Sequence, residues 1–277
     1  LESFWRNVNR AGGRNVFGDT SIWTSAFGGG VDWLKNTPGW RMAETLALSL
    51  SPYEYNPFNL NPLHDVLEGE VTFSRIRAES PIKLYISATQ IRTSKSKVFR
   101  ETELTSRHIM ASACLPQLFQ AVEIDGEPYW DGGFLANPPL WPLFYDDTPD
   151  DILIVTLNPF VREETPKSPG EIMDRLNEIT FGGALMAEMR AIAFVQELID
   201  NGALTGEFSE RLKKLFIHSI GDPATLAPLG AVSKFNIEAE FLDYLFKAGR
   251  ASATAWLAAT FDKIGVENSI DIRARFL

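Results

Sequence analysis

The sequence has 277 residues, enough to bury a sizeable core as one large domain or two small ones. Its composition, 45% hydrophobic and 22% charged, is ordinary for a globular protein. The formal net charge of −10, with no offsetting stripe of Lys and Arg, argues against a protein that binds the phosphate backbone, so we expect no nucleic-acid partner. A single cysteine, Cys114, excludes an intrachain disulfide and suits a reducing compartment. With no signal peptide and no run of about 18 apolar residues, we expect a cytoplasmic location.

Residues 1–50 form a segment rich in aromatic side chains. Its rings come from Phe4, Trp5, Phe17, Trp23, Phe27, Trp33 and Trp40, with a glycine triplet at 28–30. These rings either pack a helical hairpin onto the core or form a mobile flap that touches lipid. The chain opens inside a helical pattern, Leu1-Glu2-Ser3-Phe4-Trp5, with no initiator Met, and we expect it to be a fragment.

Hydrophobic patterning predicts alternating helices and strands along the rest of the chain. We expect helices at 41–50, 63–67 and 105–113 and strands at 82–88 and 97–99. The near-continuous apolar run 151–157 predicts a strand buried on both faces. Ser168-Pro169-Gly170-Glu171 is a capping box that starts a helix running to about residues 201–202, loosened at Gly182-Gly183. A strand at 215–220 and a helix or helix pair over 236–263 follow.

These elements predict one α/β domain over residues 1–277. Its C-terminal half, residues 170–277, is expected to be mainly helical. No internal repeat or low-complexity linker divides the chain.

The strongest local signal is a hairpin that ends in Trp130-Asp131-Gly132-Gly133. Asp125-Gly126 lies between the runs 121–124 and 127–130, and Asp-Gly between alternating apolar runs predicts a two-residue β-hairpin turn. The second strand then ends at Asp131, where two glycines let another backbone or a substrate come close. Asp131 is either a general base, if an acidic group lies opposite it, or a turn residue that bonds its own backbone.

Other catalytic or binding patterns are absent from the sequence. His64, His108 and His218 lie far apart and lack metal-ligand spacing, so we expect no metal. Cys114 lies six positions after His108 in a helical pattern, which turns the two side chains apart. Cys114 also lies in an apolar run that suits a small buried side chain. Neither a P-loop nor a dinucleotide-binding glycine motif occurs, so we expect no cofactor. No Gly-x-Ser-x-Gly elbow occurs either, and Ser25 comes closest to one.

The strings around Asp131 closely resemble bacterial patatin-like phospholipases. The resemblance covers roughly residues 50–200 and rests on Asn56-Pro57-Phe58-Asn59-Leu60-Asn61-Pro62-Leu63, Ser87-Ala88-Thr89, Ala111-Ser112-Ala113-Cys114-Leu115-Pro116, Tyr129-Trp130-Asp131-Gly132-Gly133-Phe134-Leu135-Ala136-Asn137-Pro138-Pro139, Leu157-Asn158-Pro159 and Asp174-Arg175-Leu176-Asn177-Glu178-Ile179-Thr180-Phe181.

That resemblance implies a three-layer α/β sandwich with a mostly parallel central sheet. It also implies hydrolysis of lipid acyl esters by a Ser–Asp dyad without a histidine. Asp131 corresponds to the family's catalytic Asp, which takes the proton of the serine, and Gly132 and Gly133 hold its carboxylate at the strand end. A lipid or ester is the implied substrate, and any contact with a membrane surface would be transient and rely on the aromatic segment.

The sequence departs from the family pattern in its first part. Gly28-Gly29-Gly30 is not followed by Arg at the family's position, and the serine elbow is missing. We therefore expect the nucleophile, the oxyanion loop and the first strands to lie in a segment upstream of Leu1, without which this chain is inactive. The alternative is a catalytically inactive module with the same fold that binds lipid or a partner.

Overall fold

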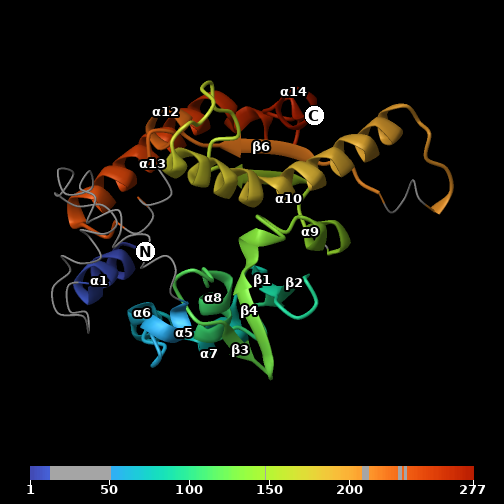
Figure 1. Cartoon of the computed structure of the whole chain (residues 1–277). Coiled ribbons are helices and arrows are strands. Elements are labelled where there is room, and N and C mark those ends of the chain that lie inside the picture. The colour runs from blue at the N-terminus through green and yellow to red at the C-terminus, as the bar shows by residue number, and fades with distance from the viewer. Residues whose placement is uncertain (13–50, 147, 208–211, 230–232, 234–235) are drawn as a thin grey trace. The chain divides into compact units, whose positions relative to one another are not determined.

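A computed structural model describes residues 1–12, 51–146, 148–207, 212–229, 233 and 236–277 (Figure 1). Helices and strands are both present, so the chain is α/β as predicted. Its contacts divide it into two compact units, each described by itself. Unit 1 comprises residues 1–137 and 230–243, and unit 2 comprises residues 138–229 and 244–277. The prediction of a single domain stays a prediction.

Unit 1 contains a four-stranded sheet with several short helices. Its elements are α1 (Glu2–Gly12), α5 (Pro52–Tyr55), α6 (Pro62–Glu70), α7 (Phe73–Glu79), β1 (Tyr85–Gln90), β2 (Lys95–Arg100), α8 (Ser106–Ser112), β3 (Val122–Ile124), β4 (Glu127–Asp131) and the 3-10 helix η1 (Gly132–Phe134). The strand order is β2-β1-β4-β3, and every neighbouring pair is antiparallel.

The predicted hairpin is confirmed as β3 and β4. Ile124 pairs with Glu127, and Asp125 and Gly126 have φ values of 52° and 79°. Two successive positive φ angles are what a type I′ turn requires, and this turn matches the twist of the two strands. The local sequence therefore fixes both the position and the register of β4.

The core of unit 1 lies where α8 packs against the sheet. Its buried members are Phe73, Ala88, Phe99, Leu104, Ala111, Ile124 and Tyr129. Helix α1 packs on α6, where Ser3 and Asn7 donate hydrogen bonds to the carboxylate of Glu70 at 2.7 and 2.5 Å.

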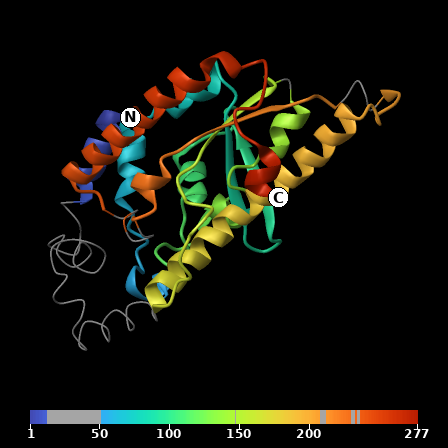
Figure 2. The same ribbon diagram turned by 90° about the horizontal axis from the view of Figure 1, so that it is seen from above.

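Unit 2 combines a parallel strand pair with a long helix. Its elements are α9 (Trp141–Tyr145), β5 (Asp151–Val155), α10 (Pro169–Asp200), β6 (Phe216–Ile220), α12 (Pro223–Leu226), α13 (Ala239–Thr260, here from residue 244), η3 (Phe261–Lys263) and α14 (Ile272–Phe276). Figures 1 and 2 both show α10 running beside the β5–β6 pair. The core between them contains Ile152, Ile154, Leu185, Met189, Ile192, Ala193, Ile217, Ile272 and Phe276.

Helix α10 begins as the sequence predicts. Ser168 is the N-cap, its hydroxyl accepts from the backbone N–H of Glu171, and Glu171 accepts from the Ser168 backbone. The expected loosening at Gly182-Gly183 is wrong, because α10 continues through both residues to Asp200.

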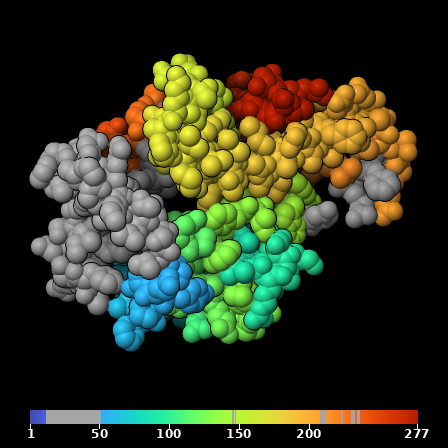
Figure 3. Space-filling model, in the orientation of Figure 1, coloured from blue at the N-terminus to red at the C-terminus, as the bar shows by residue number. Residues whose placement is uncertain are grey.

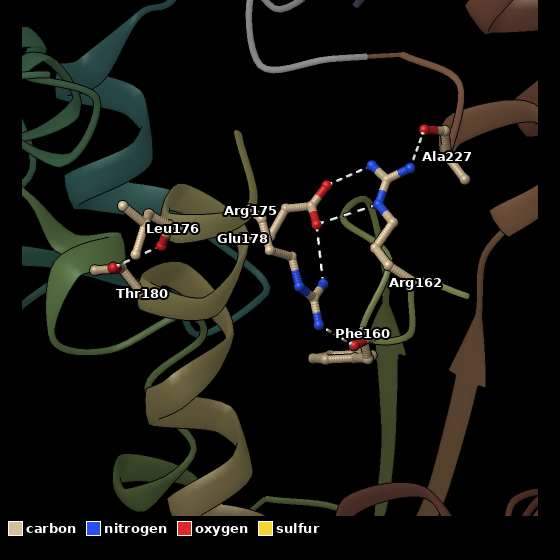
Figure 4. Close-up of polar contacts among 7 residues, drawn as sticks. All are labelled: Phe160, Arg162, Arg175, Leu176, Glu178, Thr180 and Ala227. Carbon is tan, nitrogen blue, oxygen red and sulfur yellow. Dashed lines mark hydrogen bonds and ion pairs between the residues drawn. The ribbon is translucent and has the colours of Figure 1, made fainter. Parts of the chain in front are cut away.

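A half-buried ion cluster holds the loop after β5 against α10 (Figure 4). Arg162 and Arg175 both bind the carboxylate of Glu178, at 2.5 and 3.0 Å. The side chain of Glu178 is 11% exposed. Arg162 also donates to the carbonyl of Ala227 and Arg175 to that of Phe160. Burial opposes ionisation of Glu178, but the hydrogen bonds from the two arginines outweigh it and lower the pKa of this carboxyl.

Two predictions about the strands are wrong for the described residues. The largest sheet is antiparallel rather than mostly parallel, because tight turns join β1 to β2 and β3 to β4, and only β5 and β6 run parallel. Strand β5 is buried on one face and not on both: Ile152 and Ile154 face the core, whereas Leu153 and Val155 are 47% and 65% exposed. The three-layer sandwich stays a prediction.

Other predicted elements are confirmed with shifted ends. The helix expected at 63–67 is α6, the helix at 105–113 is α8, and the strands expected at 82–88, 97–99 and 215–220 are β1, β2 and β6. The final helix expected over 236–263 is α13 followed by η3. Within the aromatic segment 1–50, the structure describes only residues 1–12, which contain α1. Residues 13–50 lie outside the described residues, and with them the helix expected at 41–50 and Gly28-Gly29-Gly30. None of the helices in the described ranges combines the length and the apolar character that a membrane span requires.

We expect Glu178→Gln to lower the free energy of unfolding by about 2–3 kcal/mol, because it leaves two half-buried guanidinium groups without their carboxylate. The pKa of Glu178 is lowered in the folded protein. Its contribution to the free energy of unfolding is therefore fully present above the pKa that the carboxyl has in the unfolded chain, and it is lost as the pH falls through the pKa of the folded protein. Urea unfolding at several pH values measures this. Arg190→Ala, on an exposed position of the same helix, is the control, and an equal loss from both variants would contradict the assignment.

Candidate active site

Asp131 is the last residue of β4, and three contacts hold its backbone in place. It pairs with Ala88 in the neighbouring strand β1. Its N–H donates to the carbonyl of Cys114 at 2.8 Å, and its carbonyl accepts from the hydroxyl of Thr89 at 2.8 Å. These contacts fix the backbone from which the carboxylate projects.

The carboxylate of Asp131 is oriented by the glycine turn that follows it. Its Oδ1 accepts from the N–H of Gly133 at 2.7 Å, which makes Asp131 the N-cap of η1. Both Gly132 and Gly133 are buried, whereas Asp131 is half-buried. The carboxylate thus bonds the backbone of its own turn, which is one of the two alternatives that the sequence leaves open, and the two glycines lie at the strand end. The catalytic role of Asp131 stays a prediction.

Gly132 is required by a close approach between two backbones. A Cβ on residue 132 would lie 2.2 Å from the carbonyl oxygen of Ser87 and 2.3 Å from its Oγ. Real side chains do not tolerate such distances. The same Ser87 hydroxyl donates to the carbonyl of Ala136 at 3.1 Å, so β1 supports both ends of the turn after Asp131.

Ser87 and Thr89 are the supporting residues that sequence reasoning did not assign. Both are buried polar side chains on β1, and each bonds a carbonyl of the segment 131–136. The string Ser87-Ala88-Thr89 already formed part of the family resemblance. Two polar side chains flanking an alanine in this strand are the signal in the sequence that points to them.

Cys114 is an inert structural thiol, as the sequence predicts. Its side chain is buried, and Sγ donates to the carbonyl of Gln120 at 3.3 Å. Burial raises the pKa of this thiol to about 11; a backbone hydrogen bond from Val122 opposes the rise and the negative charge of Asp131 adds to it. Burial is therefore the main reason that the thiol stays protonated, and the charge of Asp131 contributes less.

The three histidines do not assemble with Asp131. His108 binds Thr105 in a capping box and packs edge-on against Phe99, and burial lowers its pKa. His218 is buried in β6 of unit 2, where Nε2 lies 2.9 Å from Asp151. No group of three or more His, Cys, Asp or Glu in the described ranges is arranged to hold a metal ion.

His64 lies between Ser106 and Asp65, which give it the residue types of a Ser-His-Asp catalytic triad but not its geometry. Its Nε2 is 3.4 Å from Ser106 Oγ and its Nδ1 is 3.5 Å from Asp65, both at the limit of hydrogen bonding. Ser106 is buried, whereas the side chain of Asp65 is 93% exposed. A buried hydroxyl with a loosely held base cannot reach a substrate, so we assign no catalytic role to this group.

A cavity of about 1680 Å³ in unit 1 adjoins the site. Helices α1, α6 and α8 and the segment 119–123 line it, and Met110, Cys114 and Phe119 give it an apolar wall. Cys114 is common to both features, because it lines the cavity and its carbonyl accepts from the N–H of Asp131. The apolar wall of the cavity therefore reaches the residue whose carbonyl holds the backbone of Asp131.

Comparison with known families agrees with the resemblance. The family model described as Patatin-like phospholipase matches residues 9–144. Asp131, Gly132 and Gly133 lie inside the matched range. A comparison with curated proteins gives no match.

We expect Gly132→Ala to destabilise the protein by about 3 kcal/mol, because the added methyl group overlaps the backbone of Ser87. Gly69→Ala is the matched control: nothing lies within 4 Å of the added methyl group, and Ala favours helix α6. Thermal unfolding of both variants tests the prediction. A wild-type transition for Gly132→Ala would show that the two strands do not meet as described.

We expect the thiol of Cys114 to resist alkylation. With its pKa at about 11, only about one thiol in a thousand is ionised at pH 8, compared with roughly one in four for a free cysteine. Iodoacetamide labelling followed by mass spectrometry should therefore be slow in the folded protein and rapid in denaturant. Labelling of the folded protein at the rate of a free thiol would contradict the described burial.

Proposed function

We propose that this chain, whose residues 9–144 belong to the patatin-like family, carries the general base of a lipid acyl hydrolase. The observation that carries this proposal is the fixed position of Asp131 at the end of β4, with Gly133 bound to its carboxylate and Gly132 packed on β1. The base acts on a serine that a polypeptide segment outside these 277 residues supplies.

The reaction follows from the family resemblance and the geometry of Asp131. The carboxylate removes the proton of the serine hydroxyl while the serine oxygen attacks the ester carbonyl. The proton then passes from Asp131 to the departing alcohol, which leaves an acyl-enzyme. A water molecule attacks the acyl group with the same carboxylate as base, and the fatty acid and the serine are released. No histidine is needed, because one carboxylate both accepts and returns the proton.

The substrate class is a lipid ester with an apolar acyl chain. The cavity beside Cys114 offers apolar side chains for that chain, and two arginines, Arg10 and Arg107, lie on its wall.

We expect Asp131→Asn to reduce kcat for ester hydrolysis by about 10²–10⁴-fold, because an amide cannot accept the serine proton. The enzyme assayed must include the segment that supplies the serine. Asp125→Asn is the matched control: Asp125 lies in the turn of the same hairpin with φ of 52°, which Asn tolerates equally well.

Two results would contradict the proposal. Hydrolysis unaffected by Asp131→Asn would remove Asp131 from the mechanism. A gene that encodes nothing upstream of Leu1, together with unchanged lipid binding in Asp131→Asn, would favour the catalytically inactive lipid-binding module instead.

A further inference from the structure

The first half of α10 has its polarity reversed. Its inward side carries Arg175 and Glu178, 25% and 11% exposed, within the ion cluster of Figure 4. Its outward side carries Ile172, Leu176 and Ile179, 42%, 51% and 56% exposed. A surface helix of a globular protein normally does the opposite, with its apolar side facing the core.

These outward side chains form one continuous stripe. At about 100° per residue, positions 172, 176 and 179 fall within a sector of roughly 60°, and Met173, 58% exposed, flanks them. We call these four residues the apolar stripe. Figure 4 shows Leu176 on the side of α10 turned away from the ion cluster, and in Figure 3 the atoms of α10 lie on the near face with no other part of unit 2 in front of them.

The most exposed positions around the stripe carry no charge. The exposed residues of α10 from 172 to 187 are all uncharged: Ile172, Met173, Leu176, Asn177, Ile179, Thr180, Gly183 and Ala187. Charged residues make up 22% of the whole chain. A contiguous apolar patch of this kind on a surface marks a site of interaction.

The ion cluster keeps the stripe outside. Turning α10 to bury the stripe would pull Glu178 away from Arg162 and would also expose Leu185 and Met189, which lie in the core on the same rigid helix. Both changes are costly. The outward orientation is therefore built into the packing of unit 2.

We propose that the apolar stripe inserts into the surface of a zwitterionic lipid layer. The four half-exposed side chains offer a few hundred Å², whereas a stable dimer buries about 800 Å² on each partner, so a second copy is not favoured. The stripe has no cation to attract anionic lipid, and the net charge of −10 repels it. The choice of a lipid as partner rests on the proposed lipid hydrolase function.

Co-sedimentation with vesicles of ether-linked phosphatidylcholine tests the proposal. This lipid has no ester to hydrolyse, so the measurement reports binding alone. We expect the double variant Leu176→Glu/Ile179→Glu to lower the partition coefficient about tenfold or more, because carboxylates replace apolar side chains at the lipid boundary. Phe194→Glu is the matched control: Phe194 is 61% exposed and lies about five turns farther along the same side of α10, outside the stripe.

A wild-type protein that does not sediment with these vesicles, or an equal loss in both variants, would overturn the proposal. So would a double variant that binds vesicles normally but has a lower melting temperature or a changed oligomeric state, because protein would then cover the stripe. Hydrolysis of a water-soluble ester is measured separately. If the enzyme that includes the serine-supplying segment lacks that activity while vesicle binding is intact, the proposed function is contradicted and the stripe assignment stands.

Discussion

Strand β4 can end against β1 only because residue 132 has no side chain. The backbone of Ser87 occupies the space that a Cβ would need, and the hydroxyl of the same residue bonds the carbonyl of Ala136. This contact fixes the turn after Asp131, and the turn in turn directs the N–H of Gly133 at the carboxylate. The orientation of the candidate base thus depends on a close packing of two strands, which explains why glycine follows the aspartate.

A second constraint, an ion cluster, determines the packing of unit 2. The ion cluster of Arg162, Arg175 and Glu178 occupies the inward side of α10, where apolar side chains would usually lie. Because the helix is rigid, the apolar residues of the same turns are displaced to the outside. Buried ion pairs of this kind often contribute little net stability, but they can specify one packing among several. Here the packing they specify presents apolar side chains to the solvent.

The sequence predicts best those features that depend on a few neighbouring residues. The Asp125-Gly126 turn, the capping box at Ser168 and the buried Cys114 are all confirmed, because local backbone geometry or simple burial determines them. Strand pairing was predicted less well, since the mostly parallel sheet came from resemblance and the short turns of unit 1 impose antiparallel pairs. The roles of Ser87 and Arg162 could not be predicted, because their partners lie 49 and 16 residues away and only the folded chain brings them together.

The central claim is that Asp131 serves a serine that these 277 residues do not contain. Labelling with a fluorophosphonate, followed by peptide mapping, tests it most directly. The claim predicts that the 277-residue chain alone takes up no label. It also predicts that the longer protein, which includes the segment with the serine, is labelled on a serine of that segment. This labelling should be slower in the Asp131→Asn variant. Specific labelling of a serine within the printed chain, such as Ser87 or Ser106, would contradict it.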